Sequence, residues 1–353
     1  MQGRWLLASD VLIQVEGLKT HFFLDEGTVK AVDGVDLEVL RGKTLCVVGE
    51  SGCGKSVTAR SILQIVDPPG RIVDGKILLH RRLSTDGDGD ITETLDLAAM
   101  NPRGREIRAI RGKEIAMIFQ EPMTSLSPVH TIGHQITQAI RLHMAVTKAE
   151  ARARAIETLR LVGIPKPELR IDTYPFQLSG GMRQRAMIAM ALSCHPSLLI
   201  ADEPTTALDV TTQAQILDLM ADLQQEFGMA IMFITHDLGV VAEMADDVAV
   251  MYLGIVVEHG PVDAIFHDPK HPYTQALLRS IPQVGLKARQ RLDSIRGMVP
   301  DPYNRPRGCP FHTRCGRKMP GTCDRFIPQR VPLGSGRQVR CLLYGGDGGS
   351  HDN

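Results

Sequence analysis

Apolar and polar residues alternate near the start of the chain, and uninterrupted apolar runs replace this alternation further on. Residues 11–16 and 35–39 show the period of two that half-buried strands have. Residues 44–48, 198–201 and 231–235 are short apolar runs, typical of strands buried on both faces. The pattern therefore predicts two kinds of strand, one exposed on one side and one enclosed.

Between the enclosed strands the apolar residues recur at helical spacing. In residues 210–227 an inner face is predicted to hold Ile216, Leu217, Met220 and Leu223. Further helices are predicted at 56–63, 148–162 and 184–192. Strands that alternate with helices indicate an α/β fold around a parallel sheet.

The texture of the chain changes near residue 260. Beyond it prolines become frequent and apolar runs shorten, so we expect residues 1–260 to form one domain and residues 261–353 a separate C-terminal extension. The tail from about residue 345 is predicted to be disordered. Within the first domain, segment 84–104 is rich in Gly, Asp, Thr and Pro and is predicted to be a surface loop.

Composition and charge exclude some classes of protein. Lys plus Arg and Asp plus Glu number 40 each, so no basic excess favours a nucleic-acid partner. No run of 18 apolar residues occurs, and we expect no membrane span. An apolar patch near the start is followed by Asp10 and Glu16, and we expect no signal peptide. These features are typical of a globular protein.

One octet carries most of the functional information. Gly, four residues and Gly-Lys-Ser form the pattern of a phosphate-binding loop, here between a predicted strand and a predicted helix. Its glycines let backbone N–H groups surround phosphate oxygens. Lys55 can neutralise the β- and γ-phosphates, and Ser56 can hold Mg²⁺. The predicted contacts are Gly49, Glu50, Ser51, Gly52, Cys53, Gly54, Lys55, Ser56 and Val57.

A pair of carboxylates supplies the second constellation. The apolar run 198–201 ends in Asp202 and Glu203. Asp202 is placed to contact the Mg²⁺ shell, and Glu203 can polarise a water against the γ-phosphate. Alone, such a pair is usually a solvated strand end, but together with a phosphate loop it indicates nucleotide hydrolysis.

Four further motifs resemble those of ATP-binding cassette (ABC) ATPases, in the order that this family has. Leu178-Ser-Gly-Gly-Met182 is similar to the signature motif, and Gln120 matches the Q-loop. Ala207-Leu208-Asp209 matches the D-loop, and His236 the switch histidine. The resemblance covers roughly residues 11–260. It implies an ABC-type nucleotide-binding domain with a RecA-like parallel sheet core, an antiparallel β subdomain and a helical subdomain at about 121–180.

The resemblance also implies a mechanism. Ser179, Gly180 and Gly181 precede a predicted helix and offer a second anion site, which in the family closes on ATP held by the partner subunit. ATP then joins two subunits, and hydrolysis releases them. Gln120 would sense Mg²⁺ and the attacking water, His236 would contact the γ-phosphate, and Asp209 would couple the two sites.

Adenine recognition is less well defined by the sequence. The family stacks an aromatic residue on the base, and the candidates upstream of the phosphate loop are Phe22 and Phe23, between which spacing does not choose. Val29 is predicted to pack near the ribose.

Several strings resemble the dipeptide/oligopeptide and nickel importer ATPases. They are Arg111–Gln120, Glu121–Pro128, Asp202–Val210 and His271-Pro-Tyr-Thr274, with Thr205-Thr206 similar to the D-type subunit. The resemblance implies a heterodimer with an F-type ATPase, two permeases, an extracytoplasmic binding protein and a peripheral place on the cytoplasmic face of the inner membrane. A permease helix would dock at 121–130. Short peptides are the expected cargo, with nickel, opine-like or glycosidic solutes as alternatives.

Four of the seven cysteines cluster near the C-terminus as Cys309, Cys315, Cys323 and Cys341. Four thiolates suit either zinc or a [4Fe–4S] cluster, and His312 could substitute as a ligand. Cys-x₂-Cys pairs are absent from this cluster. The resemblance to D-type ATPases implies the [4Fe–4S] cluster and hence a small metal-binding extension. Its arginines could offset thiolate charge or form a solvated basic face: Arg305, Arg307, Arg314 and Arg317.

Two other functions are weighed against the importer. A soluble cassette ATPase of repair or translation would have long coiled-coil insertions or two cassettes. Here only about 122 residues separate Lys55 from Leu178. A redox-regulatory protein that only binds ATP would not need both Glu203 and His236.

Overall fold

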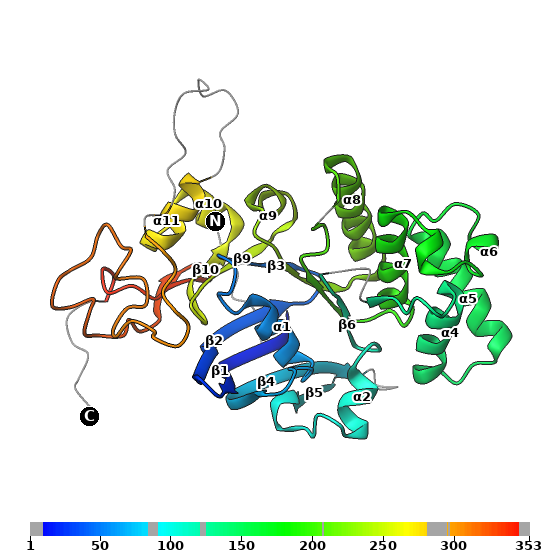
Figure 1. Ribbon diagram of the computed structural model, residues 1–353, viewed down its shortest axis with the longest axis horizontal. Coiled ribbons are helices and arrows are strands. Elements are labelled where there is room, and N and C mark those ends of the chain that lie inside the picture. The colour runs from blue at the N-terminus through cyan, green and yellow to red at the C-terminus, as the bar shows by residue number, and fades with distance from the viewer. Residues whose placement is uncertain are drawn as a thin grey trace.

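The computed structural model describes residues 10–83, 91–120, 125–206, 208–280, 295 and 297–345. Two sheets form its centre, with a group of helices at one end and the C-terminal extension at the other (Figure 1). The α/β architecture predicted from the alternation of strands and helices is therefore present.

The smaller sheet is antiparallel and contains the alternating segments. Its order is β2 (Gly27–Leu40), β1 (Val11–Leu24), β4 (Gly70–Leu83) and β5 (Ile91–Asp96). Both alternating segments lie in strands, which confirms that prediction. The loop predicted at 84–104 is wrong for residues 91–99, which form β5 and the short 3-10 helix η2 (Leu97–Ala99). Thr94 and Leu95 pair with β4, so ladder hydrogen bonds prevail over a loop-like composition.

The larger sheet has eight strands and carries the enclosed runs. Strands β9, β3, β8, β7 and β6 are mutually parallel, and β10, β12 and β11 continue the sheet antiparallel. The order is β11 (Val331–Gly334), β12 (Arg337–Val339), β10 (Ile255–Pro261), β9 (Asp247–Tyr252), β3 (Thr44–Val48), β8 (Ala230–Ile234), β7 (Leu198–Asp202) and β6 (Ile115–Ile118). The three apolar runs are fully buried strands, as predicted.

The predicted helices are present with nearly the predicted bounds. They are α1 (Lys55–Ile62), α5 (Lys148–Leu161), α7 (Gly180–Leu192) and α8 (Val210–Phe227). Local capping explains two of them. In α5, Thr147 and Glu150 form a reciprocal capping box, and α8 begins at the Asp209 cap and ends at Gly228, which is left-handed. None of the described helices is long and apolar enough to cross a bilayer.

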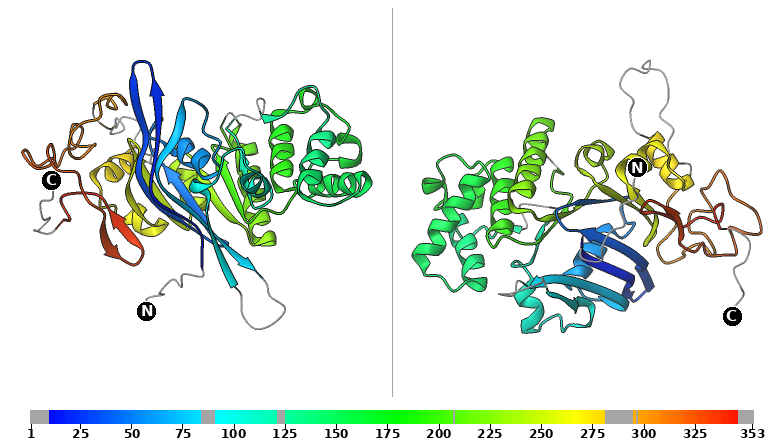
Figure 2. Two further views of the ribbon diagram at one scale, coloured as in Figure 1. Left: turned by 90° about the horizontal axis from the view of Figure 1, so that it is seen from below. Right: turned by 180° about the vertical axis from the view of Figure 1, so that it is seen from behind.

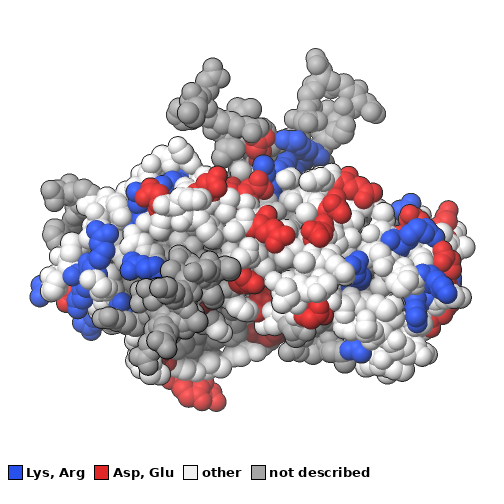
Figure 3. All heavy atoms as spheres, turned by 90° about the horizontal axis from the view of Figure 1, so that it is seen from above, with Lys and Arg blue, Asp and Glu red and all other residues white. Residues whose placement is uncertain are grey.

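A helical group lies at one end of the molecule, beyond β6 (Figures 1 and 2). It comprises α4 (Ile132–His143), α5, α6 (Pro167–Arg170), the 3-10 helix η3 (Pro175–Gln177) and α7. The other helices among the described residues are α2 (Arg105–Ile110), α9 (Leu238–Met244), α10 (Val262–His267) and α11 (Pro272–Arg279). On the face shown in Figure 3, acidic and basic side chains are interspersed.

The extension docks on the opposite end of the larger sheet (Figure 2). Strand β12 pairs with β10, where Val339 lies opposite Glu258. Arg305 and Arg340 reach strand β2 and pair with Asp33 and Asp36, each at 2.7 Å. The extension is thus joined to both sheets. The predicted disordered tail falls on residues 346–353, outside the described residues, apart from Gly345.

Candidate nucleotide-binding site

The predicted site residues lie at the carboxyl ends of adjacent parallel strands. The phosphate loop follows β3, Glu203 follows β7, His236 follows β8 and Gln120 follows β6. This edge is where open α/β sheets bind ligands, because loops from neighbouring strands converge there.

The phosphate loop has a backbone that only glycine accepts at two positions. Gly49 has a φ of 152°, and a Cβ there would lie 2.2 Å from the Met251 carbonyl oxygen. Gly54 has a φ of 102°, and its Cβ would lie 2.3 Å from the carbonyl oxygen of Ala31. Helix α1 starts directly after Gly54. Its amino end therefore faces the loop, as a phosphate site requires.

Lys55 is buried and curls beneath the loop. Its Nζ donates to the carbonyl oxygens of Gly49 at 2.8 Å and Glu50 at 3.2 Å. The ammonium group thereby lies within the loop. Cys53 is also buried, and burial raises the pKa of its thiol, which keeps it neutral and unreactive.

Two of the three candidate magnesium ligands, Ser56 and Asp202, contact each other, and the third is Gln120. Ser56 donates its hydroxyl to Asp202 Oδ1 at 2.8 Å. Asp202 is only 2% exposed, and burial raises its pKa. A buried carboxylate with a single hydroxyl partner has lone pairs left for a cation, which would offset the cost of its burial.

Glu203 is held by three side chains. Its Oε2 accepts from Gln120 Nε2 and from Thr206 Oγ1, each at 3.1 Å, and its Oε1 lies 3.4 Å from His236 Nδ1. The imidazole of His236 is 66% exposed, so a ligand can reach it. Glu203 also has a φ of 48°, a strained conformation that is common at functional sites.

The sequence motifs predict Glu203, Gln120 and His236 for this site but not Thr206. In the sequence this threonine belongs only to the Thr205-Thr206 string that resembles the D-type subunit. Its place three residues after Glu203, in the turn that follows β7, is the signal that could have found it.

The signature motif forms a second helix start. Ser179 caps α7 by accepting the Met182 N–H at 3.3 Å, and Gly180 is exposed. Gly181 lies beside Thr212, and a Cβ atom at this glycine would lie 2.9 Å from the Thr212 Cγ2 atom.

The D-loop residue Asp209 caps α8 through the same Thr212, and its hydrogen bonds to Thr212 lower the pKa of the Asp209 carboxyl. Signature and D-loop residues are therefore neighbours. Helices α7 and α1 lie in different parts of the molecule (Figure 1). Ala207 is outside the described residues.

The two phenylalanines differ in setting. Phe22 lies directly opposite Val29 across the β1–β2 pair, and both are half-buried. Phe23 is 40% exposed, and the Arg71 guanidinium lies 4.3 Å from its ring centroid.

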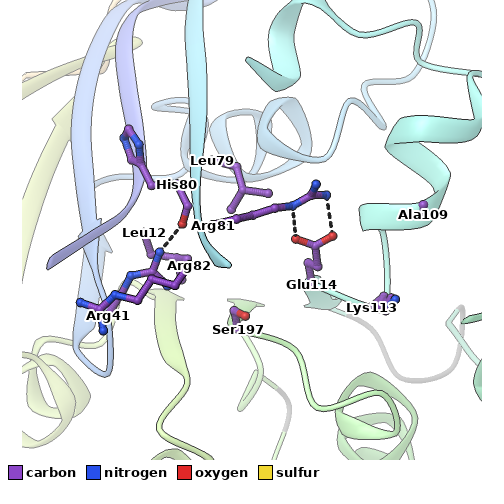
Figure 4. A pocket seen from close by; sticks show the side chains of 10 residues that line it. All are labelled: Leu12, Arg41, Leu79, His80, Arg81, Arg82, Ala109, Lys113, Glu114 and Ser197. Atoms are coloured by element: carbon purple, nitrogen blue, oxygen red, sulfur yellow. Dashed lines mark hydrogen bonds and ion pairs between the residues drawn. The ribbon is translucent and has the colours of Figure 1, made fainter. Parts of the chain in front are cut away.

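A separate cavity of about 630 Å³ is not part of this site (Figure 4). Its lining contains none of the predicted nucleotide-binding residues. Within it Arg81 makes two hydrogen bonds of 2.6 Å to Glu114, and Arg41 donates to the His80 carbonyl. These basic groups have protein partners.

The four cysteines of the extension converge without forming a tight ion site. Cys309, Cys323 and Cys341 are each 8% exposed, and Cys315 is half-buried. Burial, reinforced by the other three thiols, raises the pKa of Cys309 to about 11. Backbone N–H groups donate to sulfur at Cys315 and Cys323, each at 3.4 Å.

No group of three or more His, Cys, Asp or Glu among the described residues is arranged to hold a metal ion. The predicted substitute ligand His312 instead bonds the Cys309 carbonyl oxygen through Nδ1 at 2.8 Å. We expect four arginines to offset thiolate charge or to form a solvated basic face, but two of them form ion pairs with carboxylates instead. Arg305 pairs with Asp33 and Arg314 with Glu50, both in the cassette.

Comparisons with known proteins agree with this geometry. The family profile "ABC transporter" matches residues 32–206, and "Oligopeptide/dipeptide transporter, C-terminal region" matches residues 257–323. Among solved structures, the dimeric structure of MJ0796, a bacterial ABC transporter cassette, is 25% identical with a TM-score of 0.59, covering 71% of this chain and 99% of that one. The same cassette in a post-hydrolysis state with ADP and Pi gives a TM-score of 0.60 at 24% identity.

Curated relatives match over nearly the whole chain. The oligopeptide transport ATP-binding protein AppD of Bacillus subtilis is 50% identical, covering 96% of this chain and 98% of that protein. The dipeptide transport ATP-binding protein DppD of Escherichia coli is 47% identical, covering 94% and 96%. This chain therefore belongs to the ABC ATPases that serve as ATP-binding subunits of oligopeptide and dipeptide transporters.

Proposed function

We propose that this chain hydrolyses ATP to drive the import of dipeptides or oligopeptides through a membrane permease. The observation that carries the proposal is the arrangement of Glu203 among Gln120, Thr206 and His236, beside the Ser56–Asp202 pair and the phosphate loop. The names of AppD and DppD, which match nearly end to end, support the transport role.

The phosphate loop would bind the triphosphate of ATP through its backbone N–H groups and the amino end of α1. Lys55 would turn from its own loop carbonyls toward the β- and γ-phosphates. Ser56 and Asp202 would hold Mg²⁺, with Gln120 contributing from β6. When bound, the ion would offset the negative charge of the phosphate oxygens.

Glu203 would orient the attacking water and accept its proton. Gln120 and Thr206 fix one carboxylate oxygen, which leaves the oxygen near His236 to face the water. His236, being exposed, would contact the γ-phosphate. The strained backbone of Glu203 supports this assignment, because such strain is retained where geometry matters.

A second cassette would complete the site. The signature residues Ser179, Gly180 and Gly181 begin α7, while the loop that they would complement precedes α1, so each would serve the partner's ATP. Asp209, adjacent to the signature through Thr212, would link the two sites. The partner would be a related F-type ATPase, since the chain resembles D-type subunits.

Phe22 is the better candidate for adenine stacking. It faces Val29, the residue predicted near the ribose, whereas one face of Phe23 is covered by Arg71. Nucleotide affinity should fall more in Phe22→Ala than in Phe23→Ala, and the reverse order would assign the base to Phe23.

The helical group offers the permease a docking surface. A cavity of about 630 Å³ lies along α4 and the start of α5, lined by residues that include Thr131, Gln138 and Arg152. It is close in sequence to the predicted docking segment 121–130, of which residues 121–124 lie outside the described residues. The chain would thus work peripherally at the cytoplasmic face of the inner membrane, with two permeases and an extracytoplasmic binding protein.

The extension at 261–353, distinct from the cassette at 1–260, would hold a [4Fe–4S] cluster through Cys309, Cys315, Cys323 and Cys341. The other three thiols help to raise the pKa of Cys309, and backbone N–H groups donate to the sulfur atoms of Cys315 and Cys323. Both observations support this proposal. The cluster would cross-link a segment with little regular structure.

The proposal is tested by purifying the tagged chain from gently solubilised native membranes and identifying its companions by mass spectrometry. Two multi-span permeases and a second cassette ATPase are expected. The solute bound by the associated binding protein then separates peptides from nickel, opine-like or glycosidic cargo. Recovery of cytosolic partners alone would overturn the transport role.

A further inference from the structure

The C-terminal extension reaches into the phosphate loop. Glu50 is the second residue of the loop, and its carboxylate accepts two hydrogen bonds from Arg314, at 2.6 Å from Nη1 and 2.9 Å from Nη2. The Arg314 side chain is only 4% exposed and that of Glu50 25%. A bidentate, largely buried pair of this kind fixes both position and orientation, which exposed ion pairs seldom do.

The backbone of the same loop residue is held from the extension as well. The Glu50 N–H donates to the hydroxyl of Tyr273 at 2.9 Å, and Tyr273 is fully buried in α11. His271 caps α11 by accepting the Tyr273 N–H at 3.0 Å, and Pro272 occupies the first turn. The His-Pro-Tyr string noted in the sequence therefore has a physical purpose, because it delivers the tyrosine hydroxyl to the loop.

An aromatic cluster keeps the two anchors in place. The rings of Tyr252, Tyr273 and Phe311 lie with centroids 4.7 to 5.3 Å apart, and they come from β9, from α11 and from the part of the extension beyond α11. The guanidinium of Arg314 lies 5.8 Å from the Tyr252 centroid and donates to its hydroxyl at 3.4 Å. Arg314 is thus clamped between a ring and a carboxylate.

Glu50 in turn shapes the part of the loop that faces the phosphates. Its carbonyl oxygen accepts from Lys55 Nζ at 3.2 Å and from the Cys53 N–H at 3.3 Å. The carboxylate, the N–H and the carbonyl oxygen of this residue are all engaged. A shift of Glu50 would therefore move the lysine and the loop N–H groups together.

We propose that Arg314 and Tyr273 are positioning residues for the phosphate loop, so that the affinity for ATP depends on the docked C-terminal extension. Neither residue needs to touch the nucleotide. Through Glu50 they hold the loop open in the shape that binds phosphate, and less ordering is then required when ATP arrives. This inference rests on the proposed ATP-binding role of the loop.

The test compares two arginines of the extension that both pair with the cassette. Arg314→Met removes the pair with Glu50, whereas the matched control Arg305→Met removes the 2.7 Å pair with Asp33 on β2. ATP affinity is measured by calorimetry with Mg²⁺, and turnover as separate KM and kcat values. We expect Kd and KM to rise about tenfold in Arg314→Met, a change of roughly 1.4 kcal/mol, and less than twofold in Arg305→Met.

Two milder variants keep the result interpretable. Arg314→Lys retains the charge but not the bidentate geometry and should recover only part of the affinity. Tyr273→Phe keeps the ring packing, removes the acceptor of the Glu50 N–H and should raise the Kd by about threefold while the protein stays folded by circular dichroism. Wild-type affinity in folded Arg314→Met and Tyr273→Phe would overturn the inference, and so would an equal loss in Arg305→Met. A wild-type chain that fails to bind ATP would instead overturn the proposed function.

Discussion

The phosphate loop and the four-cysteine segment are both loops that carry chemistry, yet they are built differently. The phosphate loop joins a fully buried strand to a helix, and two glycines fit it against backbone carbonyls. The cysteine segment lies in residues 297–345, where the only regular elements described are β11 and β12. Its shape is held by turn hydrogen bonds and by side-chain pairs.

The difference shows where each loop gets its rigidity. The phosphate loop is held rigid mainly by the sheet, and in addition by the contacts that the extension makes with Glu50. The extension is held in place by the cassette, because Arg305, Arg314 and Arg340 all pair with carboxylates of the cassette. A segment with so little regular structure of its own is expected to depend for the rest of its stability on its cysteines and on the group that they bind.

The largest expected effect belongs to the cassette side of this comparison. Glu203→Gln keeps the hydrogen bond from Thr206 but cannot accept a proton, so we expect kcat for ATP to fall by about 10²- to 10⁴-fold while ATP still binds. Steady-state phosphate release and nucleotide binding measure the two quantities. The variant should also trap an ATP-bound dimer on size-exclusion chromatography.

Thr206→Val is the control for this experiment. It removes one hydrogen bond to the Glu203 carboxylate but keeps the carboxylate itself, and it should reduce kcat only several-fold. Normal turnover in Glu203→Gln would remove Glu203 from the proposed role, and the extension should keep its stability in both variants.

How much of this could be read from the sequence also differs between the two regions. The buried strands, helices α5, α7 and α8 and the edge that gathers Gln120, Glu203 and His236 follow from periodicity and motif order. These features are local or are repeated at fixed topological positions, so a pattern of residues is enough to predict them.

The features that local sequence patterns do not predict depend on long-range contacts. Nothing near Glu50 indicates that its partner is Arg314, because 264 positions separate them. The addition of β12 to β10 and the pairing of β5 with β4 are likewise set by which edge is free, and composition argued against β5. The local periodicity of apolar residues therefore does not predict the pairing of edge strands or the ion pairs between domains.

The next effect belongs to the extension. Cys309→Ser should remove one ligand of the proposed cluster, so iron should fall from about four ions per chain to near zero. We expect the thermal midpoint of the extension to drop by several degrees, while kcat in the folded fraction changes little. Iron analysis and the visible absorption spectrum of anaerobically purified protein are the measurements.

Cys194→Ser serves as the matched control, because Cys194 is buried outside the extension, near the Ala139 carbonyl oxygen. It should leave the iron content unchanged. A measured content of one zinc ion per wild-type chain would show that the site holds zinc and not an iron–sulfur cluster. Equal metal content in the wild type and in Cys309→Ser would show that Cys309 is not a ligand.

The smallest effect lies where the two regions meet, at the start of α11. Burial lowers the pKa of His271 to about 3, against 6.5 for an ordinary histidine, and the neutral ring caps the helix. Because the unfolded chain takes up a proton that the folded chain refuses, this residue stabilises the fold fully above about pH 6.5. The contribution is lost as the pH falls below that value, by up to about 1.4 kcal/mol per pH unit.

His271→Asn keeps a capping acceptor but does not titrate, so its free energy of unfolding should fall less between pH 7.5 and 5 than that of the wild type. Urea unfolding at both pH values gives the comparison. Glu258, which accepts the His271 N–H and whose pKa burial raises, acts in the opposite direction in both proteins, so the difference between them isolates the histidine. Parallel losses in the two proteins would show that the cap at α11 does not sense pH.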